Sequence, residues 1–186
     1  MVLLESLDLE QGQIMPEFDL QDPFGTQHSL SSLMGPKGLF IGFTCNHCPY
    51  AIAIWERLIQ LESNFSKLGI ATVAINPNIN PNYPDDSPAA MKKKIESDSI
   101  PFPYLIDATQ SVAKAYKAQC TPDLYVLKHD RSLFYHGRLD DNWQNPNEVT
   151  QHDLTDAITL LASNKAAPET QHPSMGCSIK WLNQSA

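Results

Sequence analysis

The sequence predicts an α/β protein built on a mixed central sheet with helices on both faces. One observation is the order of an apolar segment at Leu39–Phe43, an amphipathic segment that runs to about Gly69, and a second apolar segment at Ile70–Ile75. This order is typical of a β-α-β unit, in which the two strands are parallel and the crossover is right-handed. The other observation is a pair of short apolar segments, Leu124–Lys128 and Leu133–His136, whose short connection predicts an antiparallel hairpin.

The overall composition is that of a globular protein. The chain has 186 residues, of which 42% are hydrophobic and 18% charged, and its formal net charge is −8. Because no basic cluster is longer than Lys92–Lys94, we expect no nucleic-acid partner. No apolar segment is long enough to span a bilayer, and Glu5, Asp8 and Glu10 stand where a secretory leader would be positive. We therefore expect a cytoplasmic protein without a membrane partner.

The first elements can be justified in chain order. Phe18 and Leu20 alternate with polar residues and run into a turn at Asp22–Gly25, which predicts an N-terminal β-hairpin. Leu39–Phe43 is apolar throughout, as is usual for a central strand buried on both faces. The helix that follows has Pro49 in its first turn, where proline is tolerated. Its apolar face consists of Ile54, Leu58, Leu61 and Phe65.

The later elements alternate with polar connections. Asn76–Ser87 contains Pro77, Pro81 and Pro84 and is expected to be a loop. Ser87 is a suitable N-cap for the next helix. The remaining expected elements are a helix at about Pro88–Ser97, a strand at Tyr104–Ile106, a helix at Ser111–Lys117 and a last helix at Asp153–Ala162.

The domain boundary follows from where this periodicity stops. It is lost from Lys165 onward, so we predict one domain over residues 1–164, with its core at about 38–164, and a C-terminal tail over 165–186. The tail contains Ile179 and Trp181, and leaving such side chains exposed forfeits roughly 1.5–3 kcal/mol each. We therefore expect the tail to dock on the domain or on a second subunit.

The strongest chemical signal lies between the first central strand and its helix, in the segment Cys45-Asn46-His47-Cys48-Pro49. A C-x-x-C motif at a helix start within a β-α-β unit is typical of redox-active dithiols. The helix N-terminus stabilises a thiolate, so we expect Cys45 to be the more acidic and more exposed thiol, with Cys48 as its disulfide partner. Asn46, His47 and Pro49 would tune the pair, since a protonated His47 adds positive charge beside it.

Two other interpretations of these cysteines remain open. A zinc site could combine Cys45 and Cys48 with a further cysteine or histidine, and the available residues are Cys120, Cys177, His47 and His172. No second pair of ligands stands at zinc spacing, so no metal and no cofactor is predicted. The cysteines could also be packing thiols of a non-enzymatic binding module.

Residues further along the chain give the motif a family context. A C-x-x-C-P helix start followed by Thr121-Pro122 before a hairpin resembles the thioredoxin fold. Within that superfamily the chain resembles the alkyl hydroperoxide reductase/thiol-specific antioxidant branch, also called peroxiredoxin-like or redoxin, and a bacterial group that carries C-x-x-C. The similarity runs from about Gln13 to Trp181. The stretches that carry it are Met15–Leu20, Asp22–Gly25, Leu30–Leu33, Asp85–Pro88, Pro103–Asp107, Cys120–Asp123, Gly137–Asp141 and Gly176–Trp181.

The resemblance implies roles for particular residues. Pro122 would be a cis-proline that faces the two sulfurs, and Thr121 would offer its backbone to a bound peptide. Cys120 and Cys177 are candidate auxiliary thiols. The activity implied is a thiol-disulfide oxidoreductase that uses the Cys45-Asn46-His47-Cys48 dithiol, acts on protein or small-molecule disulfides and is recharged by a thiol reductant.

The alternative activity is a thiol-dependent peroxide reductase with Cys48 as the peroxidatic cysteine. Peroxiredoxins carry P-x-x-x-[T/S]-x-x-C, and in this register Ile41 replaces the proline and Cys45 replaces the threonine or serine. Dithiol exchange is therefore the favoured interpretation.

Overall fold

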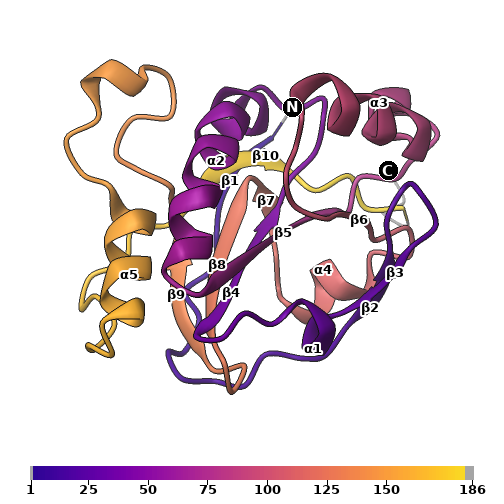
Figure 1. Cartoon of the computed structure of the whole chain (residues 1–186). Coiled ribbons are helices and arrows are strands. Elements are labelled where there is room, and N and C mark those ends of the chain that lie inside the picture. Colours follow the sequence, from indigo (N-terminus) through magenta and orange to yellow (C-terminus); the bar gives the residue numbers. More distant parts are fainter. Residues whose placement is uncertain (1, 183–186) are drawn as a thin grey trace.

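The computed structural model describes residues 2–182, and Figure 1 shows the arrangement of their elements. The strands are β1 (Leu3–Glu5), β2 (Asp19–Gln21), β3 (Gln27–Ser29), β4 (Gly38–Phe43), β5 (Ile70–Asn76), β6 (Tyr104–Ile106), β7 (Cys120–Thr121), β8 (Asp123–Lys128), β9 (Leu133–Gly137) and β10 (Met175–Ser178). The helices are α1 (Leu30–Leu33), α2 (Pro49–Lys67), the 3-10 turn η1 (Pro84–Asp86), α3 (Pro88–Asp98), α4 (Ser111–Ala115), the 3-10 turn η2 (Pro146–Glu148) and α5 (Asp153–Ala162).

The main sheet has the strand order β3-β2-β6-β5-β4-β8-β9 within the described residues. Strands β4, β5 and β6 are parallel, whereas β8 is antiparallel to β4 and β9 to β8. The expected N-terminal hairpin is the antiparallel pair β2–β3. The sheet is therefore mixed, as the β-α-β unit and the later hairpin predicted.

Helices cover both faces of this sheet (Figure 1). One face packs against α2 and α5 through an apolar cluster that includes Phe40, Leu58 and Ile158. The opposite face packs against α4 through a cluster that includes Ile41 and Tyr116. The predicted fold class, a thioredoxin-like α/β fold, is confirmed. Between residues 2 and 182 no helix combines the length and the apolar character that crossing a bilayer requires.

The junction of β4 and α2 follows directly from the sequence. All six residues of Gly38–Phe43 are buried, as the continuous apolar segment predicted. Helix α2 then begins with Pro49 in its first turn, and Cys48 is its N-cap. It ends before Gly69, whose φ of +82° is the left-handed conformation in which glycine terminates helices. The motif therefore lies at the carboxyl end of a central strand and the N-terminus of a long helix.

A second sheet joins the two ends of the chain and was not predicted. Its strand order is β1-β10-β7, and both pairings are antiparallel. The segment expected to be a tail thus supplies the central strand of a small sheet, which Figure 1 shows passing the start of α2. Ile179, just after this strand, is buried in the main core. Gly176 permits the close approach, since a Cβ there would lie 2.0 Å from the Thr121 carbonyl oxygen.

Candidate active site

Both sulfurs of the C-x-x-C motif are enclosed. Cys45 and Cys48 each have 0% of their surface exposed, although both are thiols in this structure. The prediction that Cys45 is the more exposed thiol is therefore wrong. The physical reason is that η1 and β10, which lie far away in the sequence, meet over the helix start: Asp86 of η1 contacts the motif, and Cys177 of β10 packs in the same apolar cluster as both sulfurs.

Thr121 lies against both sulfurs. The Thr121–Pro122 peptide bond is cis, as the resemblance implied. Thr121 Oγ1 lies 3.3 Å from Cys45 Sγ, and the Cys48 thiol donates to the Thr121 carbonyl oxygen at 3.0 Å. The partner of Thr121 in the antiparallel ladder is Cys177, so a segment of the same chain occupies the strand edge that the resemblance assigned to a bound peptide.

The two thiols differ in acidity, and in the opposite direction from the one predicted. The pKa of Cys48 is lowered to about 4, first because the Cys45 thiol donates a hydrogen bond to its thiolate, while burial opposes the shift. Cys177 and the Ala51 amide at the helix start stabilise the same thiolate. The Thr121 carbonyl oxygen acts against it, because it accepts a hydrogen bond only from the protonated thiol.

The pKa of Cys45 is raised above its ordinary value. Burial is the largest cause, followed by its hydrogen bond to Cys48 and by the negative charge of Asp86. Within the pair, these shifts favour the proton on Cys45 and the thiolate on Cys48. The expectation that Cys45 is the more acidic thiol is wrong, because burial first, and then the hydrogen bond to Cys48 and the negative charge of Asp86, raise the pKa of Cys45 against the effect of the helix start.

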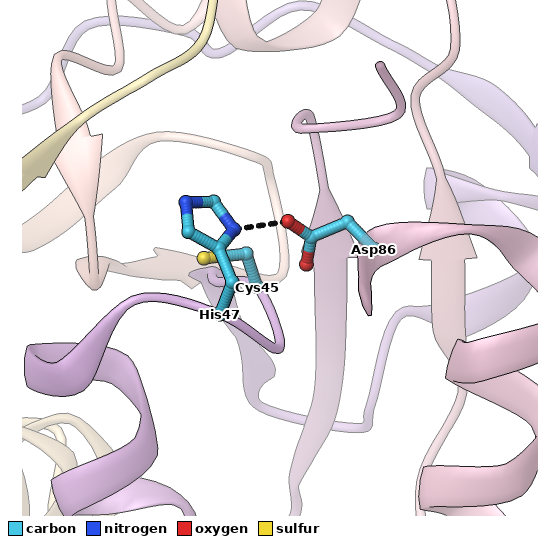
Figure 2. A group of neighbouring side chains, drawn as sticks. All are labelled: Cys45, His47 and Asp86. Atoms are coloured by element: carbon cyan, nitrogen blue, oxygen red, sulfur yellow. Dashed lines mark hydrogen bonds and ion pairs between the residues drawn. The ribbon is translucent and has the colours of Figure 1, made fainter. Parts of the chain in front are cut away.

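Asp86 is a site residue that the sequence analysis did not assign. Figure 2 shows its carboxylate pointing toward His47, whose Nδ1 it pairs with, while the Cys45 sulfur lies beside the imidazole. Its other oxygen accepts from the Asn46 backbone amide at 2.6 Å and from Asn76 Nδ2 at 3.3 Å. The signal available was topological: β4 and β5 are adjacent and parallel, so the loop after β5 opens at the same sheet edge as the motif.

Asn46 holds the motif against its surroundings. Its side-chain amide donates to the Asp85 carbonyl at 2.8 Å, and its Oδ1 accepts from the Tyr104 hydroxyl at 3.0 Å. His47 is covered in turn by the ring of Tyr83, at 4.7 Å between centroids. Asn46 and His47 therefore fix the loop to η1 and β6.

The structure groups a different set of candidate metal ligands from the set that the sequence suggested. Across the described residues, the group whose ligand atoms lie within 4.8 Å of one another is Cys45, His47 and Asp86, and not the set of cysteines with His47 or His172. Both Asp86 oxygens already accept hydrogen bonds from, or pair with, Asn46, Asn76 and His47. A metal ion would have to displace these partners, so the arrangement fits a hydrogen-bonded carboxylate–imidazole pair better than a metal site.

The two auxiliary cysteines have different surroundings. Cys120 is fully buried, its thiol donates to the Pro122 carbonyl oxygen at 3.4 Å, and burial raises its pKa. Cys177 is 1% exposed and clusters with Cys45, Cys48 and Ala51. Its thiol hydrogen-bonds to Cys48, and burial together with that bond raises its pKa to about 12. Cys177 therefore belongs to the site, whereas Cys120 packs beneath it.

A cavity of about 250 Å³ opens beside Pro122. Its lining includes Ile54, Pro122, Trp143 and Met175, and the ring of Trp143 lies 4.2 Å from that of Tyr50 between centroids. Neither Cys45 nor Cys48 lines it. Charged side chains, among them Arg138 and Asp140, also line it. The cavity is therefore a mixed apolar and charged approach to the cis-proline rather than an open path to the sulfurs.

A thioredoxin-like fold with a C-x-x-C helix start facing a cis-proline defines a redoxin-type protein, and the comparisons agree. The AhpC/TSA family model matches residues 11–136, and the chain belongs to this family. This confirms the resemblance drawn from the sequence. Thiol-disulfide oxidoreductase ResA of Bacillus subtilis is 25% identical over 119 residues, which cover 64% of this chain and 62% of the relative. The chain thus matches about three fifths of the length of the curated ResA relatives.

Two solved structures match nearly the whole chain. An uncharacterized conserved protein from Geobacillus kaustophilus is 40% identical with a TM-score of 0.93, and the match covers 100% of this chain and 99% of that one. A hypothetical protein, SMc02350, from Sinorhizobium meliloti 1021 is 36% identical with a TM-score of 0.91, covering 96% and 98%. The N-terminal strand and the C-terminal segment are therefore included in the match to the first of these relatives.

Proposed function

We propose that the protein is a thiol-disulfide oxidoreductase whose redox centre is Cys45 and Cys48. The observation that carries the proposal is the placement of both sulfurs at the N-terminus of α2, where they contact Thr121 beside the cis Thr121–Pro122 bond. The pKa of Cys48 is lowered there, which favours its thiolate. A thiolate, and not a thiol, attacks disulfides. The relationship to ResA supports the same activity.

In the proposed reaction, the Cys48 thiolate attacks one sulfur of a substrate disulfide. A mixed disulfide forms, and the other substrate sulfur leaves as a thiolate that takes up a proton. Cys45 then loses its proton and attacks Cys48 Sγ, which releases the second substrate thiol and forms the Cys45–Cys48 disulfide. A thiol reductant of the cell restores the dithiol, and the proposed compartment is the cytoplasm, where thiols are kept reduced.

The residues around the pair have distinct parts in this scheme. Thr121 Oγ1, at 3.3 Å, hydrogen-bonds to Cys45 Sγ and holds it in place. The Asp86 carboxylate keeps the proton on Cys45 until Cys48 has reacted, because its negative charge disfavours a Cys45 thiolate. The cavity beside Pro122 would receive the substrate side chains next to the disulfide.

A second candidate, the reduction of peroxides, is favoured by the lowered pKa of Cys48. Its thiolate would attack a peroxide oxygen, giving a Cys48 sulfenic acid and releasing an alcohol or water. A neighbouring thiol would then condense with the sulfenic acid to give a disulfide and water.

One paired assay separates the two activities. Reduction of insulin disulfides and consumption of hydrogen peroxide are measured side by side, with the same thiol donor and the same protein concentration. Catalysed insulin reduction that depends on Cys48, with peroxide consumption at the donor's own rate, is the expected result. Peroxide consumption without insulin reduction would instead establish the peroxidase.

A further inference from the structure

The C-terminal strand β10 brings a third cysteine to the redox pair. Cys177 is the register partner of Thr121, the residue that contacts both sulfurs of the motif. Gly176 makes this placement possible, because any larger residue there would meet the Thr121 carbonyl oxygen at 2.0 Å. The strand is fixed on its other side by β1, with Leu3 opposite Cys177. Two neighbouring strands thus hold Cys177 in one position.

The three sulfur atoms lie in a single buried cluster. Cys45, Cys48 and Cys177 pack together with Ala51 of α2, and each is at most 1% exposed. The thiol of Cys177 hydrogen-bonds to Cys48, on the side of Cys48 that faces the tail. Thiol groups that contact one another in a site closed to water are positioned for exchange, because no diffusion step separates them.

We infer that Cys177 is a third redox thiol, which exchanges with Cys48 so that the oxidised chain carries its disulfide either between Cys45 and Cys48 or between Cys48 and Cys177. This inference rests on the proposed dithiol chemistry. In the exchange, the Cys177 thiolate attacks Cys48 Sγ; the Cys45–Cys48 bond breaks, the Cys48–Cys177 bond forms, and Cys45 leaves as a thiolate that takes the proton lost by Cys177. No external oxidant is consumed, because the oxidising equivalent comes from the substrate disulfide.

The same attack can occur on a mixed disulfide between Cys48 and a substrate. Cys177 then takes the place of Cys45 as the resolving thiol, and the second substrate thiol is released in its reduced form. Burial and the contacts with Cys48 disfavour a Cys177 thiolate, and the positive charge of Lys180 acts in the opposite direction. The contribution of a Cys48 thiolate disappears once Cys48 is part of a disulfide. The site therefore holds two alternative resolving thiols, one on the motif and one on the tail.

Cys120 provides an internal comparison. It lies on β7 next to Thr121, in register with Ser178, and is as deeply buried as the others. Its thiol donates to the Pro122 carbonyl oxygen and it is not a member of the sulfur cluster. A cysteine can thus be buried near the site without contacting the sulfurs of the motif. Cys120 is therefore the matched control residue for Cys177.

The test uses the full-length chain with Cys45→Ser, in which the motif can no longer close its own disulfide. The protein is treated with oxidised glutathione, its remaining thiols are alkylated, and the disulfides are mapped by mass spectrometry without reduction. The expected product has lost glutathione and contains a Cys48–Cys177 disulfide, with Cys120 alkylated. The Cys45→Ser/Cys177→Ser double variant should instead keep glutathione on Cys48, and Cys45→Ser/Cys120→Ser should behave like Cys45→Ser alone.

A stable glutathione adduct on Cys48 of Cys45→Ser, with Cys177 alkylated, would overturn the inference. It would leave the proposed function standing, because that is judged separately by insulin reduction and a Cys45–Cys48 disulfide in the parent chain. A second variant controls for the case in which the Cys177→Ser substitution itself disturbs β10. In Cys45→Ser/Gly176→Ala, Cys177 is kept but β10 is pushed from Thr121, so the Cys48–Cys177 disulfide should be lost; its formation at the undiminished rate would also overturn the inference.

Discussion

The two sulfurs of the motif are three residues apart in sequence, yet they face different parts of the molecule. Cys45 faces η1, where the buried carboxylate of Asp86 lies beside it. Cys48 faces the helix start and the tail, where Ala51 and Cys177 offer hydrogen-bond donors. The surroundings of Cys45 therefore disfavour a thiolate, whereas the donors around Cys48 stabilise one. The comparison teaches that the difference in acidity between the two sulfurs depends on their mutual hydrogen bond and on groups from distant segments, and not on the order of the cysteines along the helix.

Removing each sulfur in turn tests this asymmetry with the largest expected effect. Cys48→Ser should lower disulfide-reductase activity by roughly 10³-fold or more, the scale expected for loss of a nucleophile. It should also form no mixed disulfide with glutathione. Cys45→Ser should still form one at Cys48, seen as a transient or trapped adduct by mass spectrometry.

Cys120→Ser is the control for these variants, since it removes a buried thiol outside the sulfur cluster and should keep near-parental activity. The opposite pattern, in which Cys48→Ser traps substrate on Cys45, would restore the roles expected from the sequence.

The sequence predicted the central sheet well because its elements are long enough to show a period. The helix Asp153–Ala162 was predicted with the bounds that the structure has, and β4 differs from its prediction by one residue. The small sheet β1-β10-β7 was not predicted, because its strands have only two to four residues and are far apart in the sequence. No periodic pattern can develop over such a length, and the apolar residues Ile179 and Trp181 were the signal that the tail docks.

The site was predictable in its residues but not in its electrostatics. Cys45, Cys48 and Pro122 could be assigned because the motif and the Thr-Pro pair are local features. The exposure and acidity of Cys45 were predicted wrongly because both depend on η1 and β10, which the sequence places 40 and more residues away from Cys45. Asp86 was visible only as part of an acidic pair in a loop.

The next prediction concerns the Cys45 side. Asp86→Asn should reduce the free energy of unfolding by about 3 kcal/mol, the lower end for breaking a buried ionic pair. The new amide has a single oxygen, so it can accept from the Asn46 backbone amide only with its NH2 group turned toward His47 Nδ1. Loss of the carboxylate should lower the pKa of Cys45, since the Asp86 charge is among the causes that raise it.

Asp85→Asn is the matched control for this variant: the neighbouring residue is exposed, and it serves the motif through its backbone carbonyl. Its free energy of unfolding, measured by chemical denaturation, should stay within about 0.5 kcal/mol of the parent. An equal loss in both variants would show that the charge of Asp86 is not what the site depends on.

The Cys48 side can be tested by changing the donor on Cys45. Cys45→Ala removes the hydrogen bond that is the largest cause of the lowered Cys48 pKa, whereas Cys45→Ser retains a hydroxyl donor. A hydrogen bond to a charged group contributes about 1.5–3 kcal/mol, so the Cys48 pKa should rise by about 1–2 units more in the alanine variant. The measurement is a pH titration of the ultraviolet absorbance of the thiolate, and equal titrations in the two variants would contradict this cause.

The same pKa shift makes stability depend on pH. The Cys48 pKa is about 4 in the folded chain against an ordinary value of 9.0, so folding favours the thiolate. Its contribution is fully present above pH 9 and is lost as the pH falls through 9 toward 4. The free energy of unfolding of the parent, relative to Cys48→Ser, should therefore rise with pH across this window, and a flat difference would show that Cys48 is not the thiolate.

The smallest expected effect is that of the His47 imidazole. His47 pairs with the Asp86 carboxylate beside Cys45, so His47→Ala removes a hydrogen-bond partner of that carboxylate. The Cys45 pKa should rise further and the reduced pair should become less stable, which makes the disulfide harder to reduce. A change of about 30 mV toward negative potential, equivalent to about 1.4 kcal/mol, is the upper range for such a partly buried pair. The measurement is equilibration with glutathione, and the His47→Ala/Asp86→Asn double variant should return toward the parental potential because the carboxylate that acts on Cys45 is then absent. An unchanged potential in His47→Ala would mean that His47 acts only by holding the loop against Tyr83.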